Sequence, residues 1–333
     1  MLNYFLAFFA SFFLAILIAP IVINLSKKLK AQQTILNYVE AHQGKQGTPT
    51  LGGIIFIIPT IIISLIFLRK DFTLALISLA GFFGFATLGF LDDFIKIKFK
   101  QNLGLRAYQK VIGQLGISLI IAVFCYKSNL VSSEILLPFT NKMVNIGWFI
   151  IPLVVLVFIA TTNSVNLTDG LDGLATGTSI IYFIAALILF FSLLSLKIVT
   201  GLLFVNELTN LIIVCLCMLG SLLAFLCFNG FPAKIFMGDT GSLAIGGLIA
   251  SVMCLSKTML FIPLFGIMFV VSSVSVIIQV LHYKRTKKRV FLMAPLHHHF
   301  QNKGVHENKI VIVYIIITIL VSSLTLVLNY LLI

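Results

Sequence analysis

The amino-acid sequence predicts an all-α, polytopic integral membrane protein. Hydrophobic residues make up 60% of its 333 residues and charged residues only 10%, whereas charged residues are about 25% of a soluble domain. The apolar residues also gather into runs of roughly 20, the length that a helix needs to cross the hydrocarbon core. The same composition excludes disordered, collagen-like and disulfide-stapled proteins.

The apolar runs predict ten membrane-spanning helices. In chain order they cover residues 3–25, 52–68, 72–91, 107–126, 146–163, 174–195, 206–228, 240–256, 259–282 and 309–332. The polar loop 127–145 is long enough for a small hairpin. Because no soluble stretch, linker or repeat interrupts the runs, we expect a single membrane-embedded domain over residues 1–333.

The basic residues predict the direction of the helices. Lys27, Lys28 and Lys30 follow the first run and no Lys or Arg precedes it, so the positive-inside rule places its N-terminus outside the cytoplasm. With ten spans, both termini are extracytoplasmic. The loops expected in the cytoplasm are 26–51, 92–106, 164–173, 229–239 and 283–308, and with the adjacent helix ends they hold most of the 23 basic residues.

Acidic residues are scarce, and most of the aspartates are clustered. The chain has only ten acids, and five of its six aspartates lie in three short motifs: Asp92 with Asp93, Asp169 with Asp172, and Asp239. The predicted topology places all three motifs on the cytoplasmic side. Ionisable groups beside apolar spans are costly and usually functional, so these motifs are the first candidates for a site.

Asp92 and Asp93 end the third apolar run, and Lys96 follows Asp92 by one helical turn. A surface ion pair would explain this spacing, but the position at the end of an apolar helix favours a functional role. Paired carboxylates beside lysines can deprotonate or orient a phosphate nucleophile, or hold a metal. The sequence leaves these possibilities open.

Residues 163–173 connect the fifth and sixth runs and contain Asn163, Asn166, Asp169 and Asp172. A helix cap would explain one acid, but not two acids and two asparagines in so short a segment. Side chains of this kind can bind sugar hydroxyls or the edge of a base. We therefore expect a substrate-binding segment here.

The motif around Asp239 opens the eighth run. Its flanking glycines let backbone N–H groups approach an anion, and a helix N-terminus favours phosphate. Asp239 is also a hard oxygen ligand suited to Mg²⁺, which prefers carboxylates together with substrate phosphates. An ordinary aspartate N-cap is compatible with this function, because a cap can also face a site.

Two further segments carry candidate phosphate ligands. His297, His298 and His299 are adjacent, and adjacent side chains diverge, so a phosphate donor or proton carrier is favoured over a zinc site. Lys45 precedes the glycine-rich turn 47–53, which contains Thr50. The glycines could serve helix packing alone, whereas Lys45 beside a rigid turn could meet a phosphate.

Five motifs resemble, in order, those of the phospho-N-acetylmuramoyl-pentapeptide-transferase family, within the polyprenyl-phosphate N-acetylhexosamine-1-phosphate transferases. They occupy residues 47–53, 91–94, 166–175, 232–242 and 294–300. The resemblance covers almost the whole chain. Small departures occur at Leu51 and, in the Asn-Gly-Phe-Pro run 229–232, at Gly230 and Phe231, and none of these three positions is an expected ligand.

The resemblance implies an activity and its setting. Phospho-N-acetylmuramoyl-pentapeptide would pass from UDP-N-acetylmuramoyl-pentapeptide to undecaprenyl phosphate, giving lipid I and UMP. It also implies Mg²⁺ as cofactor, contact with membrane lipid, a homodimer, inhibition by nucleoside antibiotics and no nucleic-acid partner. The expected location is the bacterial cytoplasmic (inner) membrane, with the active site on the cytoplasmic face.

Residue chemistry and the resemblance together predict the site residues. The expected catalytic residues are Asp92, Asp93, Asp239 and His297, with Asp239 as the metal ligand. The expected substrate contacts are Lys45, Thr50, Lys96, Lys110, Asn163, Asn166, Asp169, Asp172, Asn229, Phe236, Gly238, His298 and His299. In the family the aromatic side chain at the position of Phe236 stacks on uracil, and Lys96 and Lys110 would hold phosphate charge.

Two other functions compete with this hypothesis. An undecaprenyl-phosphate N-acetylglucosamine-1-phosphate transferase belongs to the same superfamily, but the histidine run and the 232–242 motif favour the muramoyl-peptide branch. A proton-coupled transporter would carry acids near helix midpoints, and the middle of every predicted span lacks Asp and Glu. The sequence does not distinguish a general base from a nucleophile in the aspartate pair, or identify the third residue of the peptide.

Overall fold

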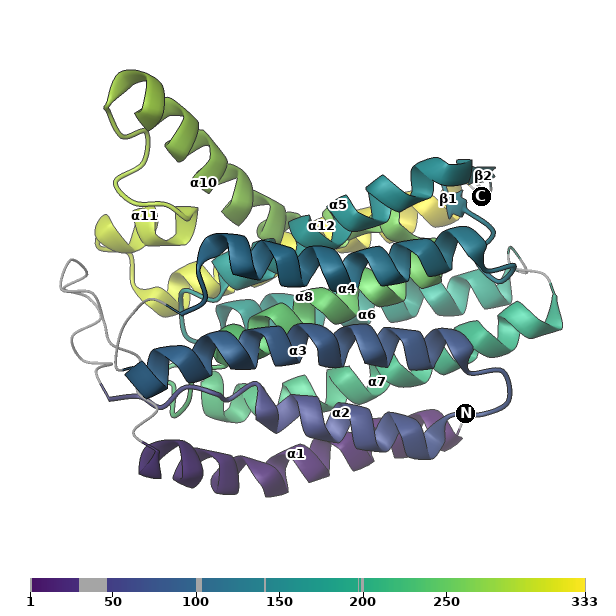
Figure 1. Cartoon of the computed structure of the whole chain (residues 1–333), viewed down its shortest axis with the longest axis horizontal. Coiled ribbons are helices and arrows are strands. Elements are labelled where there is room, and N and C mark those ends of the chain that lie inside the picture. Colours follow the sequence, from purple (N-terminus) through teal and green to yellow (C-terminus); the bar gives the residue numbers. More distant parts are fainter. Residues whose placement is uncertain are drawn as a thin grey trace.

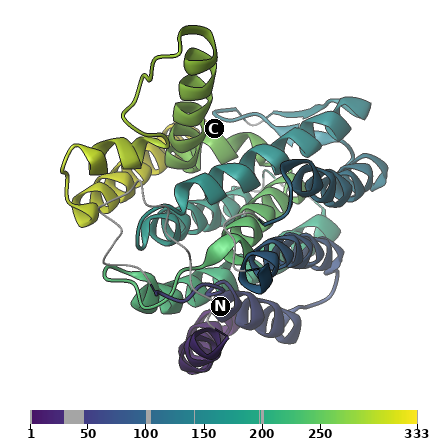
Figure 2. The ribbon, with the colours of Figure 1, turned by 60° about the vertical axis from the view of Figure 1, so that its left-hand side comes forward.

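The protein is an elongated bundle of helices that lie side by side (Figures 1 and 2). The computed structural model describes residues 2–29, 47–99, 104–140, 142–196, 198 and 201–332. In chain order the helices are α1 (Leu2–Lys28), α2 (Ile54–Phe67), α3 (Thr73–Phe99), α4 (Ala107–Lys127), α5 (Ile150–Thr168), α6 (Leu174–Ser195), α7 (Leu202–Asn229), α8 (Gly238–Leu255), α9 (Ile262–Phe265), α10 (Ile267–Thr286), α11 (Leu296–Asn302) and α12 (Glu307–Leu331). Short 3₁₀ helices occupy Gly147–Phe149 (η2) and Met259–Phe261 (η3).

The all-α polytopic fold is confirmed. Among the described residues, nine helices are long and apolar enough to cross a membrane, and α2, with 14 residues, is a shorter apolar helix. Each of the ten predicted runs overlaps one of these helices. The count of ten spans, the extracytoplasmic termini and the single domain stay predictions. The hairpin expected in loop 127–145 is present, as β1 (Glu134–Leu136) paired antiparallel with β2 (Met143–Asn145).

The predicted helix 259–282 is broken at Gly266. The chain forms η3 and α9, turns at Gly266 and continues as α10. A Cβ atom at Gly266 would lie 2.9 Å from the carbonyl oxygen of Ile262, so the turn requires a residue without a side chain. Beyond it, α10 leaves the bundle at an angle (Figures 1 and 2). Apolar composition predicts the length of a span but not this change of direction.

The centre of the bundle is α8, whose residues from Thr240 to Leu255 are all buried. Close approach between helices depends on glycines. A Cβ atom at Gly89 of α3 would clash with the backbone of Asp239, and one at Gly246 of α8 would lie 2.5 Å from the Cα of Thr162 in α5. The first contact holds the end of α3 against the start of α8, and the second holds α8 against α5.

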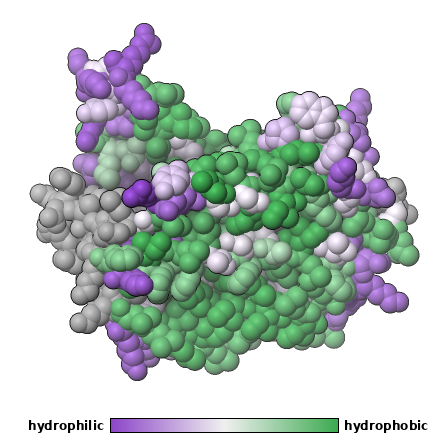
Figure 3. Space-filling model, in the orientation of Figure 1, coloured by the Kyte–Doolittle hydropathy of each residue, from purple (hydrophilic) through white to green (hydrophobic). Residues whose placement is uncertain are grey.

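The outer surface has the polarity expected of a protein embedded in lipid. Apolar side chains cover the middle of the face shown in Figure 3, and hydrophilic side chains gather towards its two ends. On α1, for example, Phe5 is 62% exposed and Leu17 69% exposed. We call the end where α3 finishes and α8 starts the site end. The opposite end is where α1 starts and α12 finishes (Figure 1).

Candidate active site

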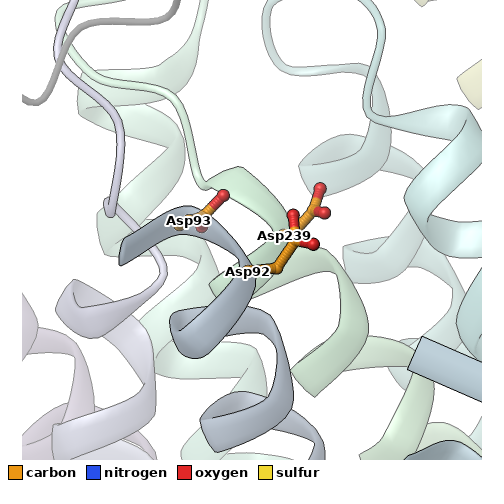
Figure 4. A group of neighbouring side chains, drawn as sticks. All are labelled: Asp92, Asp93 and Asp239. Atoms are coloured by element: carbon orange, nitrogen blue, oxygen red, sulfur yellow. The ribbon is translucent and has the colours of Figure 1, made fainter. Parts of the chain in front are cut away.

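Three carboxylates from two helices meet at the site end (Figure 4). Asp92 and Asp93 lie in the last turns of α3, and Asp239 lies in the first turn of α8. One oxygen atom from each lies within 4.8 Å of the others. Asp92 is fully buried and Asp93 is 4% exposed. The contact at Gly89, one turn before Asp93, brings the two helices close enough for this cluster.

Two lysines bridge the carboxylates. Lys96 Nζ lies 2.6 Å from Asp92 Oδ2 and 3.1 Å from Asp239 Oδ2. Lys110 Nζ, from α4, lies 3.1 Å from Asp92 Oδ1 and 2.5 Å from Asp239 Oδ2. Three carboxylates and two ammonium groups leave an excess of one negative charge when all are ionised. The cluster therefore attracts a cation, while its lysines remain available to a phosphate.

Neighbouring polar groups fix the orientation of two carboxylates. The backbone N–H and the hydroxyl of Thr240 both donate to Asp93 Oδ2, at 2.9 and 2.7 Å. Asn166 Nδ2 donates to Asp239 Oδ1 at 2.9 Å and to Ser242 Oγ at 2.8 Å. Sequence reasoning missed Thr240 and Ser242, although both follow Asp239 in the first turn of a helix, where hydroxyls commonly reach neighbouring polar groups.

Asp92 is held by the segment that leads into α4. The backbone N–H of Leu105 donates to Asp92 Oδ1 at 2.8 Å. The backbone of Gly104 lies so close to the same carboxylate that a Cβ atom there would clash. This segment therefore covers Asp92 and positions Lys110 in the second turn of the helix that follows.

The donor set of the cluster fits a divalent cation. Carboxylate oxygens are the ligands that Mg²⁺ prefers, usually together with phosphate oxygens and water. Asp239 was the predicted ligand, and the structure places oxygens of Asp92 and Asp93 within reach of the same ion. Both lysines contact Asp239 Oδ2, so a cation at that oxygen competes with them.

The glycine-rich turn 47–53 is joined to the segment that precedes α8. Phe236 N–H donates to the carbonyl oxygen of Pro49 at 2.9 Å, and Gly52 N–H donates to that of Phe236 at 2.8 Å. Gly238 has a φ of +70°, and a Cβ atom there would lie 2.7 Å from Thr50 Oγ1 and 2.5 Å from Asp93 Oδ2. Thr50, Phe236 and Gly238 are thus beside the carboxylates.

Lys45 lies outside the described residues. Three other expected substrate contacts bond protein groups instead. Asn229 accepts the Thr176 hydroxyl at 2.7 Å and donates to the Ile235 carbonyl at 3.1 Å. Asn163 Nδ2 donates to Gln114 Oε1 at 3.1 Å. Asp172 Oδ2 accepts the backbone N–H of Ala233 at 2.9 Å. In the structure these side chains support the walls of the site, and their contact with substrate stays a prediction.

Asp169 follows the last residue of α5 and lies outside the spanning helix. Burial raises the pKa of its carboxyl group well above the ordinary value, and the negative charges of Asp239, Asp93 and Asp172 raise it further. Asp169 therefore keeps its proton to a higher pH than a free aspartate. In its protonated form it can donate a hydrogen bond.

The three histidines take different partners. His297 is fully buried, and its ring centroid lies 4.3 Å from that of His298. Both rings lie against Gly170, where a Cβ atom would clash with them. His299 Nδ1 instead accepts the backbone N–H of Leu292 at 3.1 Å. The structure thus brings His297 and His298 to the 169–173 loop, while His299 faces a different segment.

Comparison with known proteins identifies the family of the chain. Residues 73–257, which include all three carboxylates, match the family described as glycosyl transferase family 4. A phospho-N-acetylmuramoyl-pentapeptide-transferase of Clostridioides difficile is 40% identical over 320 residues, which cover 95% of each chain. Proteins of the same name from Clostridium kluyveri and Thermoanaerobacter pseudethanolicus are 43% and 44% identical, over 93% and 96% of this chain and 94% and 96% of theirs. The chain belongs to the phospho-N-acetylmuramoyl-pentapeptide-transferase family.

Proposed function

We propose that the protein transfers phospho-N-acetylmuramoyl-pentapeptide from its UDP conjugate to undecaprenyl phosphate, forming lipid I and releasing UMP. The observation that carries this proposal is the cluster of three carboxylates and two lysines at one end of a bundle with an apolar surface. One substrate is a long lipid and the other a soluble nucleotide. A site at the end of a membrane-embedded bundle can receive both.

The proposed reaction depends on charge and position. An oxygen of the lipid phosphate forms a bond to the phosphorus that carries the sugar, and the bond from that phosphorus to the UMP oxygen breaks. Such transfers rely on positioning and electrostatic stabilisation rather than on extensive covalent chemistry. Lys96 and Lys110 hold the phosphate charge in this scheme. Asp92 and Asp93 act on the lipid phosphate, because they lie in the last turns of a membrane helix, where a lipid-anchored phosphate would lie.

Mg²⁺ would be held by Asp239, with Asp92 and Asp93 as neighbouring ligands, and would supply positive charge to the phosphate groups of the donor. The residual negative charge of the cluster supports this part of the proposal. Asn166, which is uncharged, orients Asp239 by donating one hydrogen bond to its Oδ1. Without an ion, Lys96 and Lys110 neutralise the same carboxylates.

The nucleotide would lie against Phe236, with Asn166, Asp169 and Asp172 near the uridine. Phe236 is half-buried and is held by backbone hydrogen bonds beside the cluster, which supports a stacking position. The family resemblance also supports a homodimer and a site on the cytoplasmic face of the bacterial inner membrane. These two assignments belong to the proposal and can be tested by cross-linking and by labelling from each side of the membrane.

The test is release of UMP by the purified full chain in detergent. We expect release from UDP-N-acetylmuramoyl-pentapeptide only when undecaprenyl phosphate and Mg²⁺ are both present, and none with EDTA. UDP-N-acetylglucosamine, offered separately, distinguishes the related transferase. A matched control is Asp71→Asn, because Asp71 pairs with Asn206 outside the cluster. Absence of UMP release with the muramoyl donor would contradict the proposed function.

A further inference from the structure

Glu307, the first residue of α12, is a buried acid outside the carboxylate cluster and outside the five family motifs. It is 7% exposed, and its Oε1 accepts the backbone N–H of Asp172 at 2.6 Å. The start of α12 is therefore tied to a loop that lies 135 residues away in the sequence.

The same line of contacts continues beyond Asp172. Its carboxylate Oδ2 accepts the backbone N–H of Ala233 at 2.9 Å. Ala233 belongs to the segment between α7 and α8, which carries Phe236 and then Asp239. Two consecutive hydrogen bonds thus connect α12, the 169–173 loop and the segment that leads into the carboxylate cluster.

The 169–173 loop meets the α11–α12 region at two other points. The backbone of Gly170 lies against the rings of His297 and His298. Leu171, 4% exposed, packs in one apolar cluster with Ile310 and Tyr314 of α12. Glu307 adds a hydrogen bond to these steric and apolar contacts. Unlike them, a hydrogen bond fixes the direction of the backbone N–H in the loop.

We propose that Glu307 is a positioning residue that holds the 169–173 loop, and through Asp172 the segment of Phe236, in place for the nucleotide. This inference rests on the proposed function, which assigns both segments to the uridine half of the donor. Because the partner of Glu307 is a backbone N–H, the loop requires an acceptor oxygen at this position. The negative charge of the Glu307 side chain matters less than this acceptor.

The test measures binding of UMP to the full-length protein by calorimetry, so it does not depend on turnover. Glu307→Ala removes the acceptor and leaves a buried N–H without its partner, and we expect UMP affinity to fall about five- to a hundredfold. Glu307→Gln retains an acceptor oxygen and should recover most of the affinity. In the transfer assay the alanine variant should raise KM for the UDP donor more than it lowers kcat.

The matched control is Glu207→Ala. Glu207 is also buried and also accepts backbone N–H groups, from Thr73 at 3.0 Å and Leu74 at 2.7 Å, but at the opposite end of the bundle. Its loss should lower the melting temperature and leave UMP affinity unchanged. If Glu307→Ala does not fold, Glu307→Asp, whose carboxylate is one methylene shorter, serves in its place.

Three outcomes would overturn the inference. UMP affinity in Glu307→Ala or Glu307→Asp could equal that of the natural protein, Glu307→Gln could lose as much as Glu307→Ala, or Glu207→Ala could weaken UMP binding to the same extent. If the natural protein itself did not bind UMP, the proposed function would fail instead. The measurement therefore separates failure of the inference from failure of the function on which it rests.

Discussion

Buried acids at the two ends of the bundle have different partners. At the opposite end, Glu207 accepts two backbone N–H groups at the start of α3, and the side chain of Asn210 accepts the backbone N–H of Arg69 at 2.9 Å. At the site end, Asp92, Asp93 and Asp239 face one another, and lysines bridge them. Asp92 and Asp93 also accept backbone N–H groups, so the difference is that the site end concentrates several charges in one cluster, whereas Glu207 serves backbone donors alone.

This difference separates a structural use of acid from a functional one. An acid that pairs with helix N–H groups stabilises the fold, because its loss leaves those donors buried and unpaired. Like charges in one cluster repel each other, and proteins retain such arrangements mainly at functional sites. Substitutions at the opposite end should therefore reduce stability, and substitutions at the site end should reduce activity.

The largest expected effect is that of Asp239→Asn. It removes the carboxylate that both lysines contact and should lower UMP release by at least about a hundredfold, the effect of losing a major electrostatic contact to the transition state. The melting temperature does not discriminate here, because the substitution removes the attraction of both lysines together with the repulsion of the neighbouring carboxylates. Full activity at ordinary Mg²⁺ concentrations would contradict the assignment. Isothermal titration with Mg²⁺ gives a second readout.

Asp92→Asn and Asp93→Asn should each lower kcat by about ten- to a hundredfold, the effect of losing one contact of a charged group in the transition state. Both should keep their affinity for UMP, because the pair is assigned to the lipid phosphate and not to the nucleotide. The measurement is a titration with undecaprenyl phosphate at saturating UDP donor. Near-normal rates in both variants would show that the carboxylate pair has no part in the reaction, and the contrast between the two ends would lose its basis.

Single alanine substitutions in the histidine run should give unequal losses of activity. We expect the largest loss, about ten- to a hundredfold, at His297, which lies against the 169–173 loop. His299→Ala should have a small effect, because that ring bonds Leu292 instead. Equal small losses at all three positions would assign the run a structural role. Stoichiometric bound zinc, measured by elemental analysis, would contradict both interpretations.

Aromatic side chains offer a matched comparison of the two ends. Phe236→Ala should weaken binding of a uridine antibiotic by about ten- to a hundredfold, because stacking on a base is worth about 1–3 kcal/mol. Trp148→Ala removes a larger ring, 66% exposed, from η2 near the opposite end, and should leave affinity unchanged. Calorimetry on both variants tests the stacking position directly. Equal affinities in the two variants would disprove it.

The sequence was most informative where local patterns suffice. Runs of apolar residues predicted the spans, and scarcity of acid singled out Asp92, Asp93 and Asp239, which the structure brings together. It was less informative about contacts between distant segments. Thr240 supports Asp93 across 147 residues, and the partner of Glu307 lies 135 residues away. No periodicity or spacing in the sequence indicates such pairs. Acidic residues are rare in this chain, however, and that signal also applies to Glu307.

The smallest expected effect concerns stability and comes from Asp169. Because the pKa of this carboxyl is raised in the folded protein, the unfolded chain loses its proton first as pH rises from about 4. Ionisation therefore favours unfolding, and the stability associated with the neutral acid is lost as pH rises through the folded pKa.

Asp169→Asn resembles the protonated form, so its melting temperature should exceed that of the natural protein by a few degrees at pH 8. The difference should shrink as pH falls towards 4, when measured without Mg²⁺ or substrate. Glu207→Gln should instead lower the melting temperature at pH 8, because its amide offers one acceptor oxygen where the two carboxylate oxygens of Glu207 accept two helix N–H groups, and one buried N–H is left without its acceptor. Opposite signs for these two substitutions would support the contrast between the ends, and a fall in both would show that Asp169 is also a structural acid.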